Sequence, residues 1–531
     1  MRAILFISCM LFLSACANKV APTGGAKDVD PPKVRLTSPE QGALSFNGKE
    51  ISIAFDEFVQ LKDAARQVVV SPPVFPKPTI TAVGKTVKVE FEKLEDSTTY
   101  VIGFGNAITD VNEGNALSGY RFVFSTGPVL DSLQVAGVAY DITNGKPLKG
   151  AMAMLFDSKW PDSVLVLRTP DHFARCDSNG VFRIENAAEG SYRLMVLSEK
   201  TENYLLDDRD ELAGFSTETV TLPTEKKYTV WAAPQPPSSL RLVSANLIPP
   251  ATLVTAFNGD ARNVIFEGFN ASIQSIAVKY SASGDTVSHF LAATADSLPV
   301  VLVLRNNGAV LDTARYNQRS QSKTGGLRDP FKPTVLSDSY AAADAPLQLV
   351  ATVPLRAIDP TRMRIFQDSI QVTIGHVSLN ADSMSMFVEK PSAEGKYSLR
   401  LDAGALTDCY GRSSDSCSFA FDVPAEKMRG SIQCKWSSPV NEKFVVELLN
   451  EKSTVVRSLP ASDTLSFHSL PPGKYRLRVL HDLNGNGKWD MGNIRKSLQP
   501  EPINYHPSEI TVRGNWEVEV VLDKVNVFGG Q

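Results

Sequence analysis

The sequence predicts an all-β protein made of about five β-sandwiches that follow one another in an extended array. Apolar and polar residues alternate with a period of two in many short segments, as Ile51, Ile53 and Phe55 do in ISIAF. Such alternation is typical of a strand with one buried face. The 34 Gly and 33 Pro residues supply turns between strands, and no long segment has a convincing helical period. The alternation and the frequent turns together favour antiparallel sandwiches.

Composition narrows the function classes. The chain has 531 residues, of which 43% are hydrophobic and 21% charged, so we expect neither a disordered chain nor a membrane protein with many spans. Its 54 Lys and Arg against 58 Asp and Glu give a net charge of -4, which leaves no excess of cations for binding nucleic acid. Six His and six Cys offer few groups for metal or acid-base chemistry. This scarcity lowers the expectation of an enzyme.

The N-terminus carries the most specific pattern in the chain. An apolar stretch from Ala3 to Ala15 follows Met1-Arg2 and leads into Leu13-Ser14-Ala15-Cys16. It is too short to span about 30 Å of hydrocarbon, and the pattern resembles a bacterial lipoprotein signal with its cleavage box. The resemblance implies that residues 1–15 are removed as a signal peptide and that Cys16 becomes a lipidated N-terminus.

The lipid on Cys16 would be the anchor, because no other segment of the sequence is a transmembrane candidate. Ala17 is not Asp, so the general sorting rule favours the outer membrane. The periplasmic and cell-surface faces both stay open, with the surface favoured. Residues 16–30, rich in Pro, Gly, Ala and Lys, form the expected lipidated tether.

Internal repeats divide the rest of the chain. The segment GSYRLMVL from Gly190 recurs as GKYRLRVL from Gly473, 283 positions later. The segment YVIGFGNAITD from Tyr100 is similar to YSLRLDAGALTD from Tyr397. We therefore expect two alternating module types. The modules, numbered one to five, are expected at 31–127, 130–235, 238–326, 329–424 and 428–526, with one and four of one type, two and five of the other, and three without a counterpart.

Two modules resemble known families. Module one, through ISIAFDEFVQL and AITDVNEGNALSGYRFVFSTG, resembles the bacterial Ig-like domain named for the S-layer protein SbsA, as found in lipoproteins of the Bacteroidota. Module two, through GVAYDITNGKPLKGAMAMLFD and CDSNGVFRIENAAEGSYRL, resembles the carboxypeptidase-regulatory or Cna-B type of sandwich. The resemblance implies a row of Ig-like sandwiches that act as non-catalytic spacers and binding modules.

One loop has the spacing of a calcium site. The segment DLNGNGKWDMGN has the spacing of a calcium loop, with oxygen side chains at positions one, three, five and nine and the glycine Gly487 at position six. The candidate ligands are Asp482, Asn484, Asn486, Lys488 and Asp490. Asn493 stands where a bidentate Glu is usual, so any calcium affinity is expected to be weak. The alternative is a pair of Asx turns that need no ion. The equivalent loop of module two keeps Glu199, Asn203 and Asp207, which favours a structural role shared by both repeats.

The sequence does not decide whether two cysteines of module four form a disulfide. Cys409 and Cys417 flank the turn before the last strand of module four and could form a disulfide in an oxidising compartment. Two separate thiols are the equal alternative. Neither His172 nor His376 has a catalytic motif around it.

No other catalytic motif is present, since GxSxG, HExxH and P-loop patterns are all missing from the sequence. Trp160, Trp436 and Trp489 could stack on sugars, although capping of sandwich ends is the simpler interpretation. The favoured function is a non-catalytic scaffold or accessory subunit of an envelope protein complex, with outer-membrane protein partners. The resemblance to extended Ig-type lipoproteins of the Bacteroidota, which are associated with envelope assemblies, suggests the β-barrel assembly machinery as the partner. The alternative is a surface adhesin or glycan-binding lipoprotein.

Overall fold

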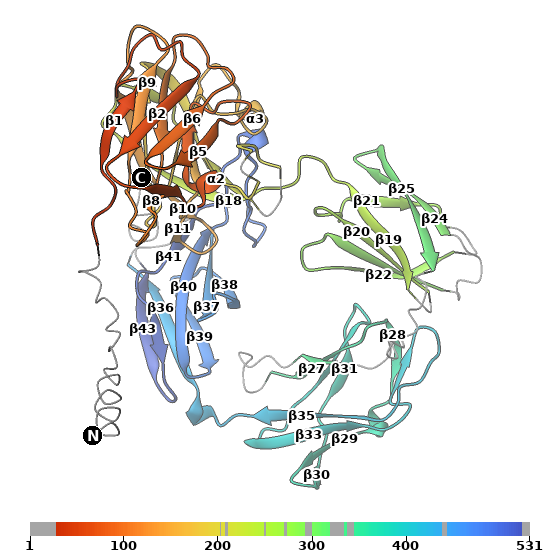
Figure 1. Cartoon of the computed structure of the whole chain (residues 1–531). Coiled ribbons are helices and arrows are strands. Elements are labelled where there is room, and N and C mark those ends of the chain that lie inside the picture. The colour runs from red at the N-terminus through yellow and green to blue at the C-terminus, as the bar shows by residue number, and fades with distance from the viewer. Residues whose placement is uncertain are drawn as a thin grey trace, which may run out of the picture.

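The computed structural model describes residues 28–522, except 202, 208–210, 249–250, 270–272, 293–299, 319–333, 337–344 and 438–442. The predicted signal peptide, Cys16 and nearly all of the tether lie outside the described residues. Nearly all regular secondary structure of the described chain is strand, which confirms the all-β prediction (Figure 1). Its helices are single short turns, and none of those described is long and apolar enough to cross a membrane.

Module one is a sandwich of two main sheets, ordered β1-β2-β6-β5 and β4-β7-β9, with the pair β3-β8 at one end. The predicted alternation is confirmed, because Ile51, Ile53 and Phe55 of β2 are all buried in its core. Its elements are β1 (Val34–Ser38), β2 (Glu50–Phe55), β3 (Val59–Leu61), α2 (Ala64–Gln67), β4 (Val69–Ser71), β5 (Thr79–Val83), β6 (Thr86–Glu90), β7 (Thr99–Gly103), β8 (Ile108–Asp110) and β9 (Arg121–Ser125).

Module four repeats this topology with sheets β26-β27-β32-β31, β28-β34 and β30-β29-β33-β35. The sequence similarity between the segments from Tyr100 and Tyr397 therefore corresponds to equivalent strands, β7 and β33. Its elements are β26 (Thr334–Leu336), β27 (Leu347–Val350), β28 (Leu355–Ile358), η1 (Pro360–Arg362), β29 (Met363–Gln367), β30 (Ile370–Val372), β31 (Val377–Leu379), β32 (Ser385–Val388), β33 (Gly395–Leu401), β34 (Leu406–Asp408), β35 (Cys417–Val423) and η2 (Glu426–Met428).

Module two pairs its first and last strands, β10 and β18, in parallel, and its long strand β15 pairs β12, β16 and β17. Its elements are β10 (Leu133–Asp141), β11 (Lys146–Pro147), β12 (Met152–Asp157), α3 (Asp162–Leu165), β13 (His172–Arg175), β14 (Val181–Ala187), β15 (Gly190–Ser198), β16 (Leu212–Phe215), β17 (Val220–Leu222) and β18 (Lys227–Pro234).

Module five has the same pairings, with β36 parallel to β43 and β40 paired with β37, β41 and β42. The repeated segments from Gly190 and Gly473 form the equivalent strands β15 and β40. Its elements are β36 (Gly430–Trp436), β37 (Phe444–Asn450), β38 (Val455–Pro460), β39 (Thr464–Leu470), β40 (Gly473–His481), η3 (Ile494–Lys496), β41 (Ile503–Tyr505), β42 (Ile510–Val512) and β43 (Glu517–Leu522).

Module three follows a single seven-stranded path, β21-β24-β25-β19-β20-β23-β22, which no other module shares in the described chain. Strands β21 and β22 end this path and pair with one neighbour each. Its elements are β19 (Leu242–Ile248), β20 (Thr252–Phe257), β21 (Val264–Glu267), β22 (Ser275–Tyr280), β23 (Thr286–Leu291), β24 (Val300–Asn306) and β25 (Ala309–Gln318).

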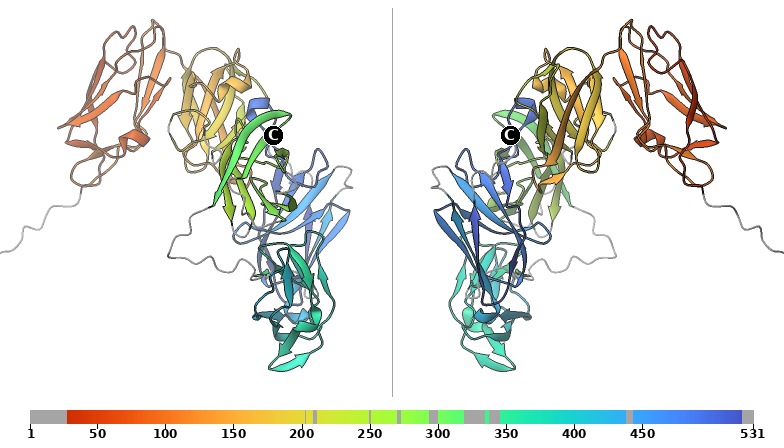
Figure 2. Two further views of the ribbon diagram at one scale, coloured as in Figure 1. Left: turned by 90° about the vertical axis from the view of Figure 1, so that its right-hand side faces the viewer. Right: turned by 90° about the vertical axis from the view of Figure 1, so that its left-hand side faces the viewer.

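The modules follow one another in tandem, but the expectation of an extended array needs a correction. The chain turns back on itself, so that module five lies against module two (Figure 1). Module one lies on the other side of module two (Figure 2). The physical reason is that residues of module five complete an apolar surface of module two that would otherwise face water.

Candidate functional site

The contact between modules two and five is the most extensively built feature outside the sandwich cores. The segment that connects β40 to β41 reaches into module two and places Ile494, which is 1% exposed, in an apolar cluster. The members of this cluster in module two include Leu165, Val166, Leu206 and Phe215. Packing of this kind stabilises by excluding water from apolar surface. The two repeats are therefore joined by a small shared core.

Polar groups fix the position of this segment. The backbone N–H of Ile494 donates to Oε1 of the buried Gln235 at 2.9 Å. The Arg495 guanidinium donates to the carbonyls of Leu206 and Pro236, and the Gln499 amide donates to the carbonyl of Phe215. Each of these hydrogen bonds joins a specific pair of groups. Together they fix one position of the segment on module two.

A second contact lies beside the first. Tyr505 of β41 donates from its hydroxyl to the carbonyl of Thr143, and Arg478 donates to the same carbonyl at 3.0 Å. The Tyr505 ring needs the turn glycine Gly145, which has a φ of 69° and whose added Cβ would stand 2.7 Å from the ring. Apolar residues surround these bonds, and they are Ile142, Ala233, Val445, Leu480 and Ile503, with Trp231 and Trp489 against them.

A half-buried ion pair supports this second contact. The Arg478 guanidinium donates to the Glu447 carboxylate, and the two side chains are 15% and 14% exposed. Burial opposes the charge of Arg478, but the hydrogen bond that Arg478 donates to the Tyr505 hydroxyl and the nearby Glu447 carboxylate outweigh it and raise the Arg478 pKa. Arg478 therefore stays charged and holds both its own module and Thr143 of module two.

The candidate calcium loop leads into this docking segment. Asp482 is 6% exposed and its carboxylate accepts the backbone N–H groups of Gly485, Asn486 and Gly487. Asp490 accepts from the side-chain amides of Asn484 and Asn486. The structure thus brings four of the five predicted oxygen ligands together, in the Asx-turn arrangement that was the alternative. No group of three or more His, Cys, Asp or Glu that could hold a metal occurs in the described part of the chain.

Sequence analysis missed the residue that braces this loop. Glu501, 4% exposed, accepts the N–H of Leu483 with one oxygen and that of Asp490 with the other. In module two, Glu211 accepts from Lys200 and Asp207, which occupy the positions equivalent to Leu483 and Asp490. The loops differ in length, so the two glutamates do not align at the offset of the repeat. A shared brace supports the structural interpretation of both loops.

We expect the substitution Asp482→Ala to lower the free energy of unfolding of module five by about 1–3 kcal/mol, because the loop N–H groups of Gly485, Asn486 and Gly487 lose a charged acceptor. Saturating calcium should change the melting temperature of the wild type little or not at all, and that of the variant not at all. Chemical and thermal denaturation measure both effects, with the exposed Asp463→Ala as the control. A calcium-dependent rise of several degrees that Asp482→Ala abolishes would establish a bound ion instead.

The candidate disulfide of module four is not formed in the structure. The two cysteines lie beside different sheets, since Cys409 follows β34 and Cys417 begins β35. Cys417 begins β35 opposite Leu401, whereas the Cys409 N–H donates to the carbonyl of Pro354 beside the pair β28-β34. Burial raises the pKa of the Cys409 thiol, which makes it a poor nucleophile at neutral pH.

The aromatic residues considered for sugar binding mostly pack within the protein. Trp489 donates from its indole N–H to the carbonyl of Glu501 in the contact between modules two and five, and Trp436 stacks on Phe444. Trp160, 36% exposed, lies under the Arg168 guanidinium. His172 is buried beside Tyr192, and burial lowers its pKa.

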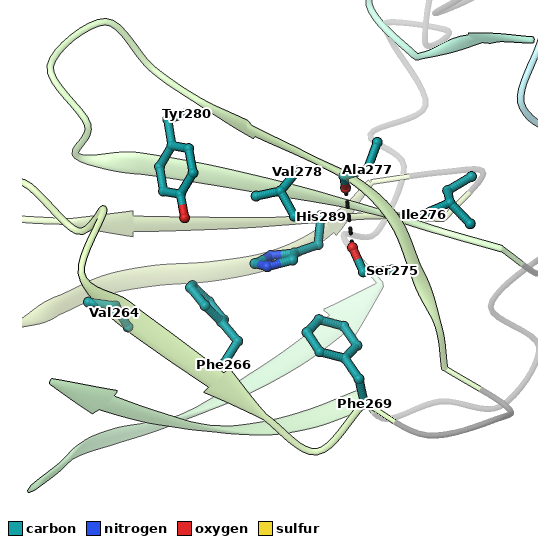
Figure 3. Close-up of a pocket in the computed structure, with 9 residues that line it drawn as sticks. All are labelled: Val264, Phe266, Phe269, Ser275, Ile276, Ala277, Val278, Tyr280 and His289. Carbon is teal, nitrogen blue, oxygen red and sulfur yellow. Dashed lines mark hydrogen bonds between the residues drawn. The ribbon is translucent and has the colours of Figure 1, made fainter. Parts of the chain in front are cut away.

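Module three contains a cavity of about 360 Å³ between the two ends of its sheet (Figure 3). His289 of β23 projects into it between the rings of Phe266 and Phe269, at centroid distances of 4.4 and 5.2 Å. This histidine is 5% exposed, and its Nδ1 has no hydrogen-bond partner. Burial lowers its pKa to about 4, so the ring is neutral at physiological pH and keeps an unused polar atom.

The strand that borders this cavity exposes apolar side chains to solvent. Ile276, Val278 and Tyr280 of β22 are 44%, 47% and 38% exposed. Ala277 of β22 packs against the core of module four. Among the described residues β22 pairs only with β23, so its other edge and the face that carries Ile276, Val278 and Tyr280 stay exposed.

A family comparison identifies the fold of module one. Residues 28–126 match the model of a bacterial Ig-like domain. The chain contains a bacterial Ig-like domain in these residues. No curated protein matches the sequence.

Solved structures of low similarity were also found. The Bacillus anthracis TIE protein is 10% identical, with 94% of this chain and 76% of that chain covered and a TM-score of 0.15. BcpA, the major pilin subunit of Bacillus cereus, is 11% identical, with 74% and 99% covered and a TM-score of 0.14. The Streptococcus pneumoniae pilus adhesin RrgA is 12% identical, with 36% and 33% covered and a TM-score of 0.12. At these TM-scores the likenesses support no assignment of function.

Proposed function

We propose that the protein is an acyl-anchored outer-membrane lipoprotein that acts as a non-catalytic scaffold or accessory subunit of an envelope protein complex. The observation that carries the proposal is that modules two and five bind each other, whereas module three has an exposed apolar surface. Among the described residues, module three keeps an unpaired strand edge, exposed apolar side chains and a buried histidine whose Nδ1 has no hydrogen-bond partner. The docked pair of modules two and five, which we call the closed frame, would hold module three in position for the partner.

The partner of this proposal is an outer-membrane protein that contributes an extended segment with apolar side chains at alternate positions. Such a segment would pair with the free edge of β22 and cover Ile276, Val278 and Tyr280. A donor on the segment would satisfy Nδ1 of His289. The resemblance of the chain to extended Ig-type lipoproteins of the Bacteroidota makes the β-barrel assembly machinery the first partner to test.

The anchor has its own test. We expect Cys16→Ser to remove the protein from the membrane fraction, because the acyl chains are the proposed attachment. Fatty-acid labelling and fractionation of cells measure this, with Cys9→Ser in the predicted signal peptide as the control. Label that is retained in Cys16→Ser would contradict the proposed anchor.

Native purification from detergent-solubilised membranes tests the proposed role of module three. Wild-type protein should bring down a stoichiometric outer-membrane partner, and Val278→Glu should reduce the yield of that partner at least tenfold, because a carboxylate would be buried in an apolar contact. Val310→Glu, at a position 58% exposed on β25 of the same module, is the matched control and should keep the full yield. Recovery of a lone lipoprotein from the wild type would contradict the proposal and favour the surface adhesin.

A further inference from the structure

A second cavity, of about 650 Å³, lies where modules one and two meet. These modules are held together by polar and aromatic contacts. The Phe173 N–H donates to the Ser71 hydroxyl at 2.9 Å, and Phe75 packs on Tyr204 edge to face. Figure 2 shows the two modules side by side. The cavity has the volume of a small-molecule binding site, and both modules are required to form it.

The charge of the cavity differs from that of the chain. Five cationic residues line it, and they are Arg66, Arg121, Lys149, Arg175 and Arg183. Only two acidic residues do so, Asp177 and Glu185. The whole chain has a net charge of -4, so the excess of cations is a local feature. Cations that converge on a concave surface raise the local concentration of anions.

The two acidic residues are already engaged. Glu185 forms an ion pair with Arg121 and lies 3.9 Å from Arg183. Asp177 accepts the N–H groups of Asn179 and Val181 within the turn between β13 and β14. Glu185 therefore offsets part of the charge of Arg121 and Arg183. With five cationic and two acidic side chains, the lining still has an excess of positive charge.

Neutral polar groups define the kind of anion. Gln67, Asn106 and Tyr120 line the module-one wall, and Ser178 lines the module-two wall. Amide and hydroxyl groups of this kind donate to and accept from sugar hydroxyls, and guanidinium groups bind carboxylates and phosphates through paired bonds. We propose that the cavity between modules one and two binds an anionic sugar of about disaccharide size. This site is separate from the module-three surface and does not depend on the proposed scaffold role.

Titration calorimetry of the full-length protein in detergent tests the site. Digalacturonate carries carboxylates and trehalose 6-phosphate carries phosphate, so the pair shows which anion is preferred, and neutral trehalose is the control ligand. At least one anionic sugar should bind, with an affinity that falls as salt is added, and trehalose should not. Arg66→Gln and Lys149→Gln, from opposite walls and both exposed, should each weaken binding about tenfold.

Arg513→Gln, in module five, is the matched control and should bind as the wild type does. The proposal would be overturned by equal binding of trehalose, by affinities that neither variant changes, or by no binding of either anionic sugar. Binding of a tetraglutamate peptide in place of the sugars would also overturn it and would assign the cavity to acidic proteins.

Discussion

Replacing Ile494 by Asp should separate module five from module two. The substitution places a carboxylate without a partner among the apolar side chains of module two, where Ile494 is 1% exposed. Burying such a charge costs more than the contact contributes, so the modules should part rather than accept it. We expect the free energy of docking between modules two and five to fall by several kcal/mol, which is sufficient to separate the two modules in nearly all molecules.

Small-angle X-ray scattering of a chain that begins at Ala17 should register this opening as an increase in the radius of gyration. Leu498→Asp is the control, because this residue of the same segment is 55% exposed and should leave the scattering unchanged. Each module should keep its own cooperative unfolding in the Ile494→Asp variant, since the sandwich cores are not altered. An unchanged radius of gyration would show that the contact does not determine the shape.

Replacing Glu447 by Ala should destabilise module five by about 3–5 kcal/mol, because it leaves the Arg478 guanidinium half-buried without its carboxylate. Arg478 also donates to Thr143 of module two, so the contact between the modules should weaken as well. Chemical denaturation followed by the fluorescence of the module-five tryptophans measures the first effect.

The matched control for this prediction is Glu519→Ala. Its partner is Lys435 at 2.9 Å, and the two side chains are 63% and 45% exposed, so solvent screens the pair and its loss should cost no more than about 1 kcal/mol. If both substitutions lowered the free energy of unfolding equally, burial would not make the Arg478–Glu447 pair stronger than the exposed Lys435–Glu519 pair. That outcome would contradict the role assigned to Arg478.

The fold was readable from the sequence because a sandwich core imposes a local pattern. Burial of Ile51, Ile53 and Phe55 on one face follows directly from their spacing of two. The repeat at an offset of 283 residues likewise predicted that β15 and β40 would be equivalent. Both signals come from residues that are close together in the chain, or from similarity between two segments.

The contact between modules depends on surfaces that meet far apart in the sequence, and it was not predicted. One signal was present in β12, where MAMLFD is apolar at successive positions and five of its six residues are buried. A strand with one solvent face would alternate, so a continuous apolar run indicates that both faces are covered. Glu501 and Glu211 were missed for a different reason, because the two loops differ in length between the equivalent strands.

Amide hydrogen exchange at Ile494 tests most directly whether the two repeats are docked in solution. Its N–H donates to Gln235 across the contact and lies in a segment that has no sheet partner of its own. Full-length protein in detergent should show this amide strongly protected, and Ile494→Asp should abolish the protection in the segment. Exchange of the wild-type amide at the rate of an unstructured peptide would contradict the closed frame.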